Sequence, residues 1–155
     1  MKHMRIHPRL LGYLGRALSL ELSAVQQYMT QAALAEAWGL PEAARRFREE
    51  TVEEMRHAER IIQRMLTLGV APNASQLRPA GVARNLADLL RQDAALEAEI
   101  TALYQDAAIF CERIGDAGNG AFFEGLLREE LEHAQQIDTW LASLTVPHQT
   151  DRAYF

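Results

Sequence analysis

The chain has 155 residues and a mass of 17.4 kDa, and we expect it to form a single domain over residues 1–155 with a buried core of its own. Its 48% hydrophobic and 24% charged residues exclude a disordered chain, and its net charge of −5 excludes a broad basic surface for nucleic acid or anionic membrane. A single cysteine excludes an intrachain disulfide and a cysteine-built zinc site. Since neither a secretory signal nor an apolar stretch of roughly 18 residues is found, we expect a cytoplasmic protein without a membrane span.

Four helices are predicted from the composition and from the positions of glycine and proline. Alanine, leucine, glutamate and arginine are abundant, and these residues favour helix. Breaks are expected at Trp38-Gly39-Leu40-Pro41, in the Gly- and Pro-containing stretch 69–84, and at 115–120. The predicted helices cover about residues 8–38, 41–68, 82–114 and 117–144, and a C-terminal tail covers 145–155.

The lengths of the three connections predict the topology. The first and third connections are short, so each joins antiparallel neighbours. The second has about 14 residues and can extend about 46 Å, whereas a helix of about 28 residues is ~42 Å long. It is therefore long enough to run the length of the bundle. This predicts an all-α, ferritin-like antiparallel four-helix bundle with one long crossover between helices two and three. An up-down-up-down bundle with a loose middle loop is the alternative.

Acidic residues and histidines interrupt the apolar face of every predicted helix. They lie near mid-helix, at positions where the 3.6-residue period would place core side chains. These residues are Glu21 in the first helix, Glu54 and His57 in the second, Glu97 in the third, and Glu130 and His133 in the fourth. The second and fourth helices thus share a Glu-x-x-His spacing, which puts both side chains on one helix face.

Four carboxylates in one core would be strongly destabilising without compensating charge. Two divalent cations supply that charge, and two Glu-x-x-His pairs with one further Glu from each remaining helix form the ligand set of carboxylate di-iron and di-manganese bundles. Such a ligand set suits iron or manganese better than zinc. Glu53, Glu129 and Glu132 are neighbouring alternatives, but the spacing to histidine selects Glu54 and Glu130. The competing interpretation is that these charges are solvated.

Four stretches of the chain resemble the bacterioferritin family, the haem-containing ferritins of bacteria. These stretches are 18–28 (LSLELSAVQQY), 53–60 (EEMRHAER), 90–97 (LRQDAALE) and 129–133 (EELEH), within a resemblance from about Leu10 to Leu144. The resemblance implies a ferroxidase centre in which Glu54 and Glu130 bridge two irons, Glu21 and Glu97 are terminal ligands, and His57 and His133 bind one iron each. It further implies that Fe(II) is oxidised by O2 or H2O2 and that the mineral is stored in a shell of subunits.

Two further roles depend on residues beside this centre. Met55 follows Glu54 and so points about 100° away from the metal face; the resemblance implies an axial ligand of haem b at a two-fold dimer interface, and packing in that interface without haem is the alternative. Tyr28 lies seven residues after Glu21 on the same face, where it is either a hydrogen-bonding neighbour of the metals or a core residue. Tyr104 bears the same relation to Glu97, and there we expect a core residue.

The C-terminal tail and the possible rival activities leave the assembly and the reaction open. Pro147 should end the fourth helix, which predicts a short or absent fifth helix. In the resembled family that helix lines the channels of a 24-subunit cage, so we expect a homo-oligomer, with a dimer favoured over a cage. A small di-iron or Mn/Fe oxidase or oxygenase that stores no iron is the alternative function.

Overall fold

The computed structural model describes residues 5–73 and 76–145, which form four helices joined without any strand in these ranges. The helices are α1 (Pro8–Ala37), α2 (Pro41–Thr67), α3 (Leu86–Arg113) and α4 (Ala117–Thr145). The predicted all-α four-helix bundle is confirmed. The expected absence of a fifth helix concerns residues 146–155, which lie outside the described ranges.

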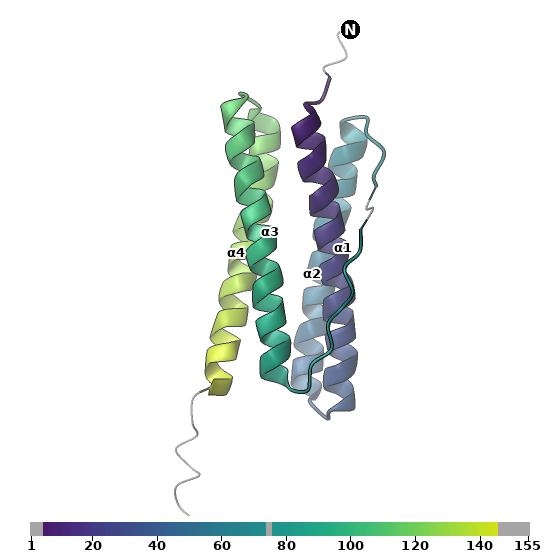
Figure 1. The fold of residues 1–155 in the computed structure, drawn as a ribbon, viewed down its shortest axis with the longest axis vertical. Helices are drawn as coiled ribbons and strands as arrows, with labels where there is room; N and C mark the ends of the chain where they lie inside the picture. The colour runs from purple at the N-terminus through teal and green to yellow at the C-terminus, as the bar shows by residue number, and fades with distance from the viewer. Residues whose placement is uncertain (1–4, 74–75, 146–155) are drawn as a thin grey trace, which may run out of the picture.

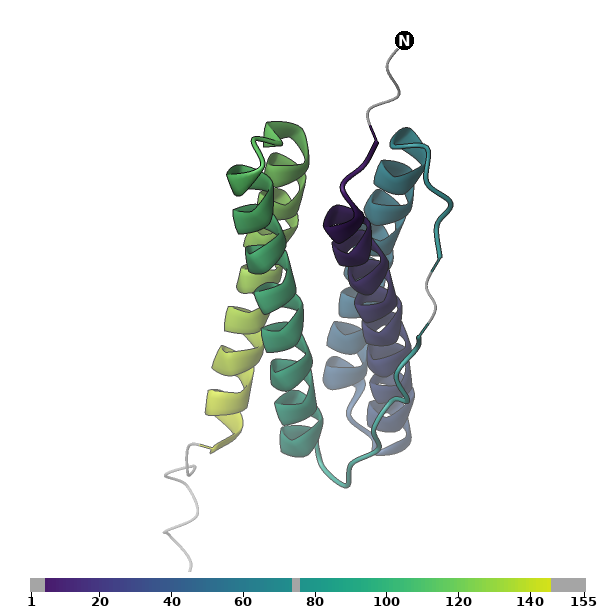
Figure 2. The same ribbon diagram turned by 45° about the horizontal axis from the view of Figure 1, so that its top comes forward.

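Two antiparallel helix pairs lie side by side (Figures 1 and 2). α1 packs most extensively on α2, and α3 on α4. The crossover segment after α2 runs along the outside of the α1–α2 pair to its opposite end, where α3 begins (Figure 1). α2 and α3 therefore point in the same direction, as the long connection predicts. In the described part of the chain, no helix combines the length and apolar character needed to cross a membrane.

Glycine ends three of the helices in the same way. Gly39, Gly69 and Gly115 follow α1, α2 and α3 with φ of 73°, 74° and 72°, a left-handed conformation that only glycine adopts without strain. The residue after each glycine donates its N–H back into the helix, as Leu40 does to the carbonyl of Ala35 at 2.9 Å. These glycines end each helix at the point where the chain must reverse its direction along the bundle.

The third helix begins later than the sequence suggests. Its first residue is Leu86, rather than residue 82, because Asn85 has an extended backbone and caps the helix with its side chain. The Asn85 side-chain oxygen accepts the backbone N–H of Asp88 at 2.9 Å. The start of α3 is therefore set by the cap at Asn85 and not by the apolar residues Val82 and Ala83 that precede it in the sequence.

Large aromatic side chains fill the bundle above and below a polar middle. Tyr28, Phe47, Tyr104 and Phe123 are all fully buried, and Cys111 is buried with them. Phe47 precedes Glu54 by about two helical turns, and Phe123 precedes Glu130 by the same distance. The core is therefore apolar at both ends and carries its charged groups at the centre.

Candidate metal centre

The bundle brings together all six residues predicted as metal ligands. Every helix contributes, and each contributing side chain is buried. Glu21, Glu54, Glu97 and Glu130 are 0% exposed, His57 is 1% exposed and His133 is 8% exposed. Ionisable groups are rarely buried so completely without a partner of opposite charge. Solvated helix charges, the competing interpretation of the sequence, are therefore excluded for these six.

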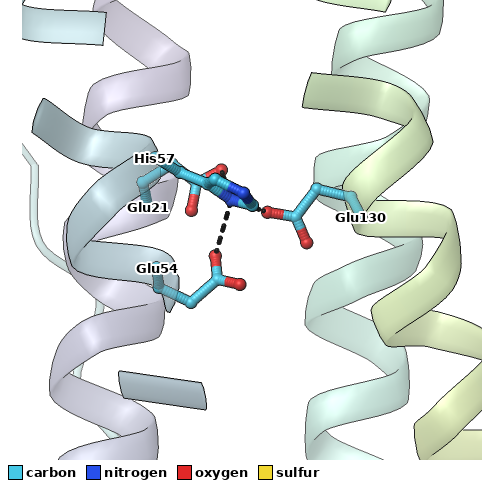
Figure 3. A group of neighbouring side chains, drawn as sticks. All are labelled: Glu21, Glu54, His57 and Glu130. Carbon is cyan, nitrogen blue, oxygen red and sulfur yellow. Dashed lines mark hydrogen bonds and ion pairs between the residues drawn. The ribbon is translucent and has the colours of Figure 1, made fainter. Parts of the chain in front are cut away.

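Their ligand atoms form two overlapping groups. One consists of Glu21, Glu54, His57 and Glu130, and the other of Glu54, Glu97, Glu130 and His133; in each, the ligand atoms all lie within 4.8 Å of one another. Figure 3 shows the first group, with the Glu130 side chain reaching across from the α3–α4 pair toward His57. Glu54 and Glu130 belong to both groups, as residues that bridge two cations would.

The histidines hydrogen-bond across the bundle. Nδ1 of His57 lies 2.7 Å from Oε1 of Glu130, and Nδ1 of His133 lies 2.9 Å from Oε1 of Glu54. The histidine of each Glu-x-x-His pair is thus hydrogen-bonded to the glutamate of the other pair. The Nδ1 atoms of both imidazoles face the carboxylates, so these nitrogens are the ones available to a cation at the centre.

One oxygen of every central carboxylate has no hydrogen-bond partner. These are the Oε2 atoms of Glu21, Glu54, Glu97 and Glu130, and all are buried. Such atoms are costly to bury because a carboxylate oxygen can only accept. Four carboxylates and two imidazoles, aimed inward with unused oxygens, fit a pair of divalent cations with oxygen and nitrogen ligands.

Burial and mutual repulsion raise the pKa of three of the four carboxyl groups. Burial, reinforced by the charge of Glu21, raises the pKa of Glu54 to about 8 and that of Glu130 to about 7. Burial likewise raises the pKa of Glu97 well above its usual value. For Glu21, burial is outweighed by hydrogen bonds to Glu54 and His57, so its pKa is lowered.

The two imidazoles are shifted in favour of their charged forms. Burial by itself would lower their pKa values, but the adjoining carboxylates reverse this effect. Glu130, Glu21 and Glu54 raise the pKa of His57 far above its usual value, and Glu130 and Glu54 raise that of His133 to about 11. Without metal, protons therefore neutralise the centre.

Two buried tyrosines donate to two of the central carboxylates. The hydroxyl of Tyr28 lies 2.8 Å from Oε1 of Glu97, and that of Tyr104 lies 2.5 Å from Oε1 of Glu21. Tyr28 is thus a hydrogen-bonding neighbour of the centre. The expectation that Tyr104 merely fills the core is wrong, because its hydroxyl holds Glu21. Tyr28 follows Glu21 by seven residues and Tyr104 follows Glu97 by the same interval, and this shared spacing could have predicted the same role for both tyrosines.

Two acidic residues near the centre were not singled out from the sequence as site residues. Oε2 of Glu50 lies 3.4 Å from Nδ1 of His133. Asp93 is fully buried, and its Oδ1 accepts the side-chain N–H of Gln27 at 2.8 Å. Burial raises the pKa of Asp93 to about 7. Asp93 precedes Glu97 by four residues, which places both on one helix face, and this spacing could have identified it.

The neighbouring alternatives to the ligands lie at the surface. The side chains of Glu53 and Glu129 are 41% and 45% exposed, and Glu132 is exposed as well. Met55 is 52% exposed on the outer side of α2, in the same exposed apolar class as Met29 and Val52. Met55 is therefore not part of the buried centre and is available for contacts outside this subunit.

This fold and this buried centre define a carboxylate-rich, ferritin-like four-helix bundle with two overlapping groups of candidate metal ligands. Residues 11–145 match the family model of ferritin, described as a ferritin-like domain. The chain is 34% identical to bacterioferritin from Rhodobacter capsulatus over 139 residues, covering 90% of this chain and 86% of that protein. It is 33% identical to bacterioferritin from Brucella melitensis over 138 residues, covering 89% of this chain and 86% of that protein. The chain therefore belongs to the bacterioferritin family.

A solved structure supports the same conclusion. Bacterioferritin from Rhodobacter capsulatus matches this fold with a TM-score of 0.85 at 34% identity, over 90% of this chain and 87% of that one. That crystal structure, at 2.6 Å, has a metal-free dinuclear site and a haem iron in a crystallographic special position. The resemblance drawn from the sequence motifs is confirmed.

Proposed function

We propose that this protein oxidises Fe(II) at the buried centre and stores the Fe(III) product within an oligomeric shell. The observation that carries the proposal is the pair of overlapping ligand groups that share Glu54 and Glu130. Shared carboxylates hold two ions close together, as a reaction that draws one electron from each of two Fe(II) ions requires. Membership of the bacterioferritin family supports storage as the outcome.

The two Fe(II) substrates supply two electrons to one oxidant molecule. With two protons, dioxygen is thereby reduced to hydrogen peroxide, or hydrogen peroxide to two molecules of water, and two Fe(III) ions result. The six buried residues bind and orient the substrate ions in a site shielded from bulk water, where their charges act strongly. The ligand set also suits manganese, so a mixed-metal centre belongs to the same proposal.

We assign distinct roles to the residues of the centre. Glu54 and Glu130 bridge the two ions, Glu21 and Glu97 each bind one ion, and His57 and His133 complete the two positions. The hydroxyls of Tyr104 and Tyr28 hold the terminal carboxylates, which is supported by their hydrogen bonds to Glu21 and Glu97. Hydrogen bonds of this kind fix ligand orientation and strengthen metal binding.

An aerobic Fe(II) titration of the metal-free protein tests the proposal, with oxidised and soluble iron counted per chain. Uptake of tens to hundreds of ions per chain is expected for a storage shell. Saturation near two would instead favour the non-storing di-iron oxidase. Glu54→Ala and His133→Ala should abolish rapid oxidation while leaving the helical fold, and Glu132→Ala, an exposed neighbour on α4, should oxidise iron normally. Unchanged rates in both ligand variants would refute the assigned centre.

Haem b is proposed to bind between two copies of the chain, with Met55 from each copy as an axial ligand. The exposed thioether of Met55, with Met29 and Val52 also exposed, offers the sulfur ligand and apolar contacts that such a site needs. Haem added to the purified protein should give the absorption spectrum of low-spin, methionine-ligated iron. Met55→Leu, which keeps the apolar bulk, should lose that spectrum; an unchanged spectrum would refute the assignment.

A homo-oligomer in the cytoplasm is the proposed form of the protein. The apolar residues exposed on α1 and α2 support at least a dimer, since apolar surface of this kind is usually buried by association. Light scattering of the purified protein would distinguish a dimer from a 24-subunit cage. Storage of a mineral requires a closed shell of this kind.

A further inference from the structure

We propose that Glu129 and Arg60 position the imidazole of His57, so that the metal position of His57 binds a divalent cation more tightly than that of His133 and fills first. The inference rests on the proposed metal centre and adds an inequality between its two positions. Neither Glu129 nor Arg60 is a ligand in this proposal; they act through His57.

The outer nitrogen of His57 is buried and faces Glu129. Nδ1 points into the centre, 2.7 Å from Glu130, whereas Nε2 lies on the other side of the ring, 3.8 Å from Oε2 of Glu129. Nε2 is buried and has no hydrogen-bond partner. When Nδ1 binds a cation, the ring proton must reside on Nε2, where it needs an acceptor. A small rotation of the Glu129 side chain provides one.

Arg60 holds the Glu129 carboxylate in place. Its guanidinium donates to the same Oε2 atom of Glu129, which links α2 to α4 beside His57. The Arg60 and Glu129 side chains are 39% and 45% exposed, so the pair lies at the edge of the core, where Glu129 borders the outer side of the imidazole. An anchored carboxylate loses less conformational freedom on accepting the ring proton than a free one would.

The other half of the centre has no such arrangement, although the sequence repeats. Glu53 stands before Glu54 as Glu129 stands before Glu130, but Glu53 accepts from Arg56 on its own helix at 2.7 Å. The position that corresponds to Arg60 is Gln136, three residues after His133. The anchoring cation is therefore replaced by a neutral amide.

The contacts of His133 differ accordingly. Within the described ranges, the carboxylates within 4.0 Å of this imidazole are Glu50, Glu54 and Glu130, and each comes closest to Nδ1. The His133 side chain is 10% exposed, compared with 1% for His57. Its outer edge thus lacks an anchored acceptor. Loss of such a partner typically lowers metal affinity by about 10–100-fold, which sets the expected difference between the two positions.

Calorimetric titration of the metal-free protein with Co(II), together with its visible absorption, tests the inference. The unmodified protein should bind two Co(II) ions, the first about 10–100-fold more tightly. Glu129→Ala should weaken the first affinity by that factor, and Glu129→Gln should restore part of it because the amide oxygen can accept. Glu53→Ala is the matched control, at the equivalent position of the other half and with similar exposure, and should leave the first affinity unchanged.

A spectroscopic measurement separates positioning from a general effect on the fold. In protein loaded with diamagnetic Zn(II), the Nε2–H proton of His57 should give a slowly exchanging NMR signal that Glu129→Ala removes and Glu53→Ala retains. If Glu129→Ala does not fold, Arg60→Gln replaces it, and an unchanged first affinity in that variant would overturn the inference. Two equal affinities in the unmodified protein would overturn it while leaving the proposed function intact. Failure to bind two ions at all would instead refute the proposed centre.

Discussion

Loading the metal-free protein with two divalent cations at pH 7 is expected to release about three or more protons per chain. The expectation follows from the raised pKa values of the buried centre, because metal ligands must be deprotonated to bind. A centre of ionised carboxylates and neutral imidazoles would release almost none. The number of protons therefore reports directly on the charge state of the buried groups.

The magnitude can be worked out group by group. Both imidazoles are charged at pH 7, since the surrounding carboxylates raise their pKa values far above 7. Burial raises the pKa of Glu97 as well, so any proton that this group holds adds to the count. With a pKa of about 8, Glu54 is about nine-tenths protonated, and with a pKa of about 7, Glu130 is about half protonated. Glu21, whose pKa is lowered, contributes nothing.

Calorimetric titration with Zn(II) or Co(II) in two buffers of different ionisation enthalpy measures this release. Repeating it at pH 9 supplies a control within the same protein. There Glu54 and Glu130 have already ionised, so the release should fall by about one proton. Release of one proton or fewer at pH 7, or a number that does not decrease at pH 9, would refute the assignment of protons as the neutralising charge.

Three further outcomes are expected. The metal-free protein should lose stability between pH 6 and 9. Glu54 and Glu130 have raised pKa values in the folded state, so each keeps a proton there that the unfolded chain has already released. Proton binding therefore stabilises the folded state, and this contribution is lost as the pH rises through the folded pKa. A fall in Tm over that range checks it, and a rise would contradict it. Metal at 100 times its Kd should add about 2.7 kcal/mol of stability, which a chelator should remove; an unchanged Tm with chelator would argue against binding to the folded state. Phe123→Ala, at a fully buried position, should cost about 3–5 kcal/mol in denaturant unfolding, whereas Leu131→Ala, at a 53% exposed position, should cost far less; equal costs would refute this account of the core.

Much of the fold follows from local features of the sequence. Gly39, Gly69 and Gly115 end helices because the left-handed backbone there excludes other residues, and the long connection after α2 has the length to cross the bundle. The four central glutamates and two histidines were identified by the same local logic. Residues three or four apart share a helix face, so a polar residue in an apolar stripe must point into the core.

Contacts between helices required the tertiary structure. Tyr104 donates to Glu21 across the bundle, and Asp93 is buried against Gln27 of another helix. These partners depend on how each helix is rotated and shifted along its axis relative to its neighbours, which the periodicity of a single helix does not specify.

The same reason explains why two sequence-equivalent glutamates behave differently. Glu129 pairs with Arg60 of α2 beside His57, whereas Glu53 pairs with Arg56 one turn along its own helix. The sequence by itself determined that each Glu-x-x-His pair carries an adjoining acidic residue. Only the packing of α2 against α4 decided which of the two reaches a histidine, because a side chain can pair across helices only where the facing helix presents a partner within its reach.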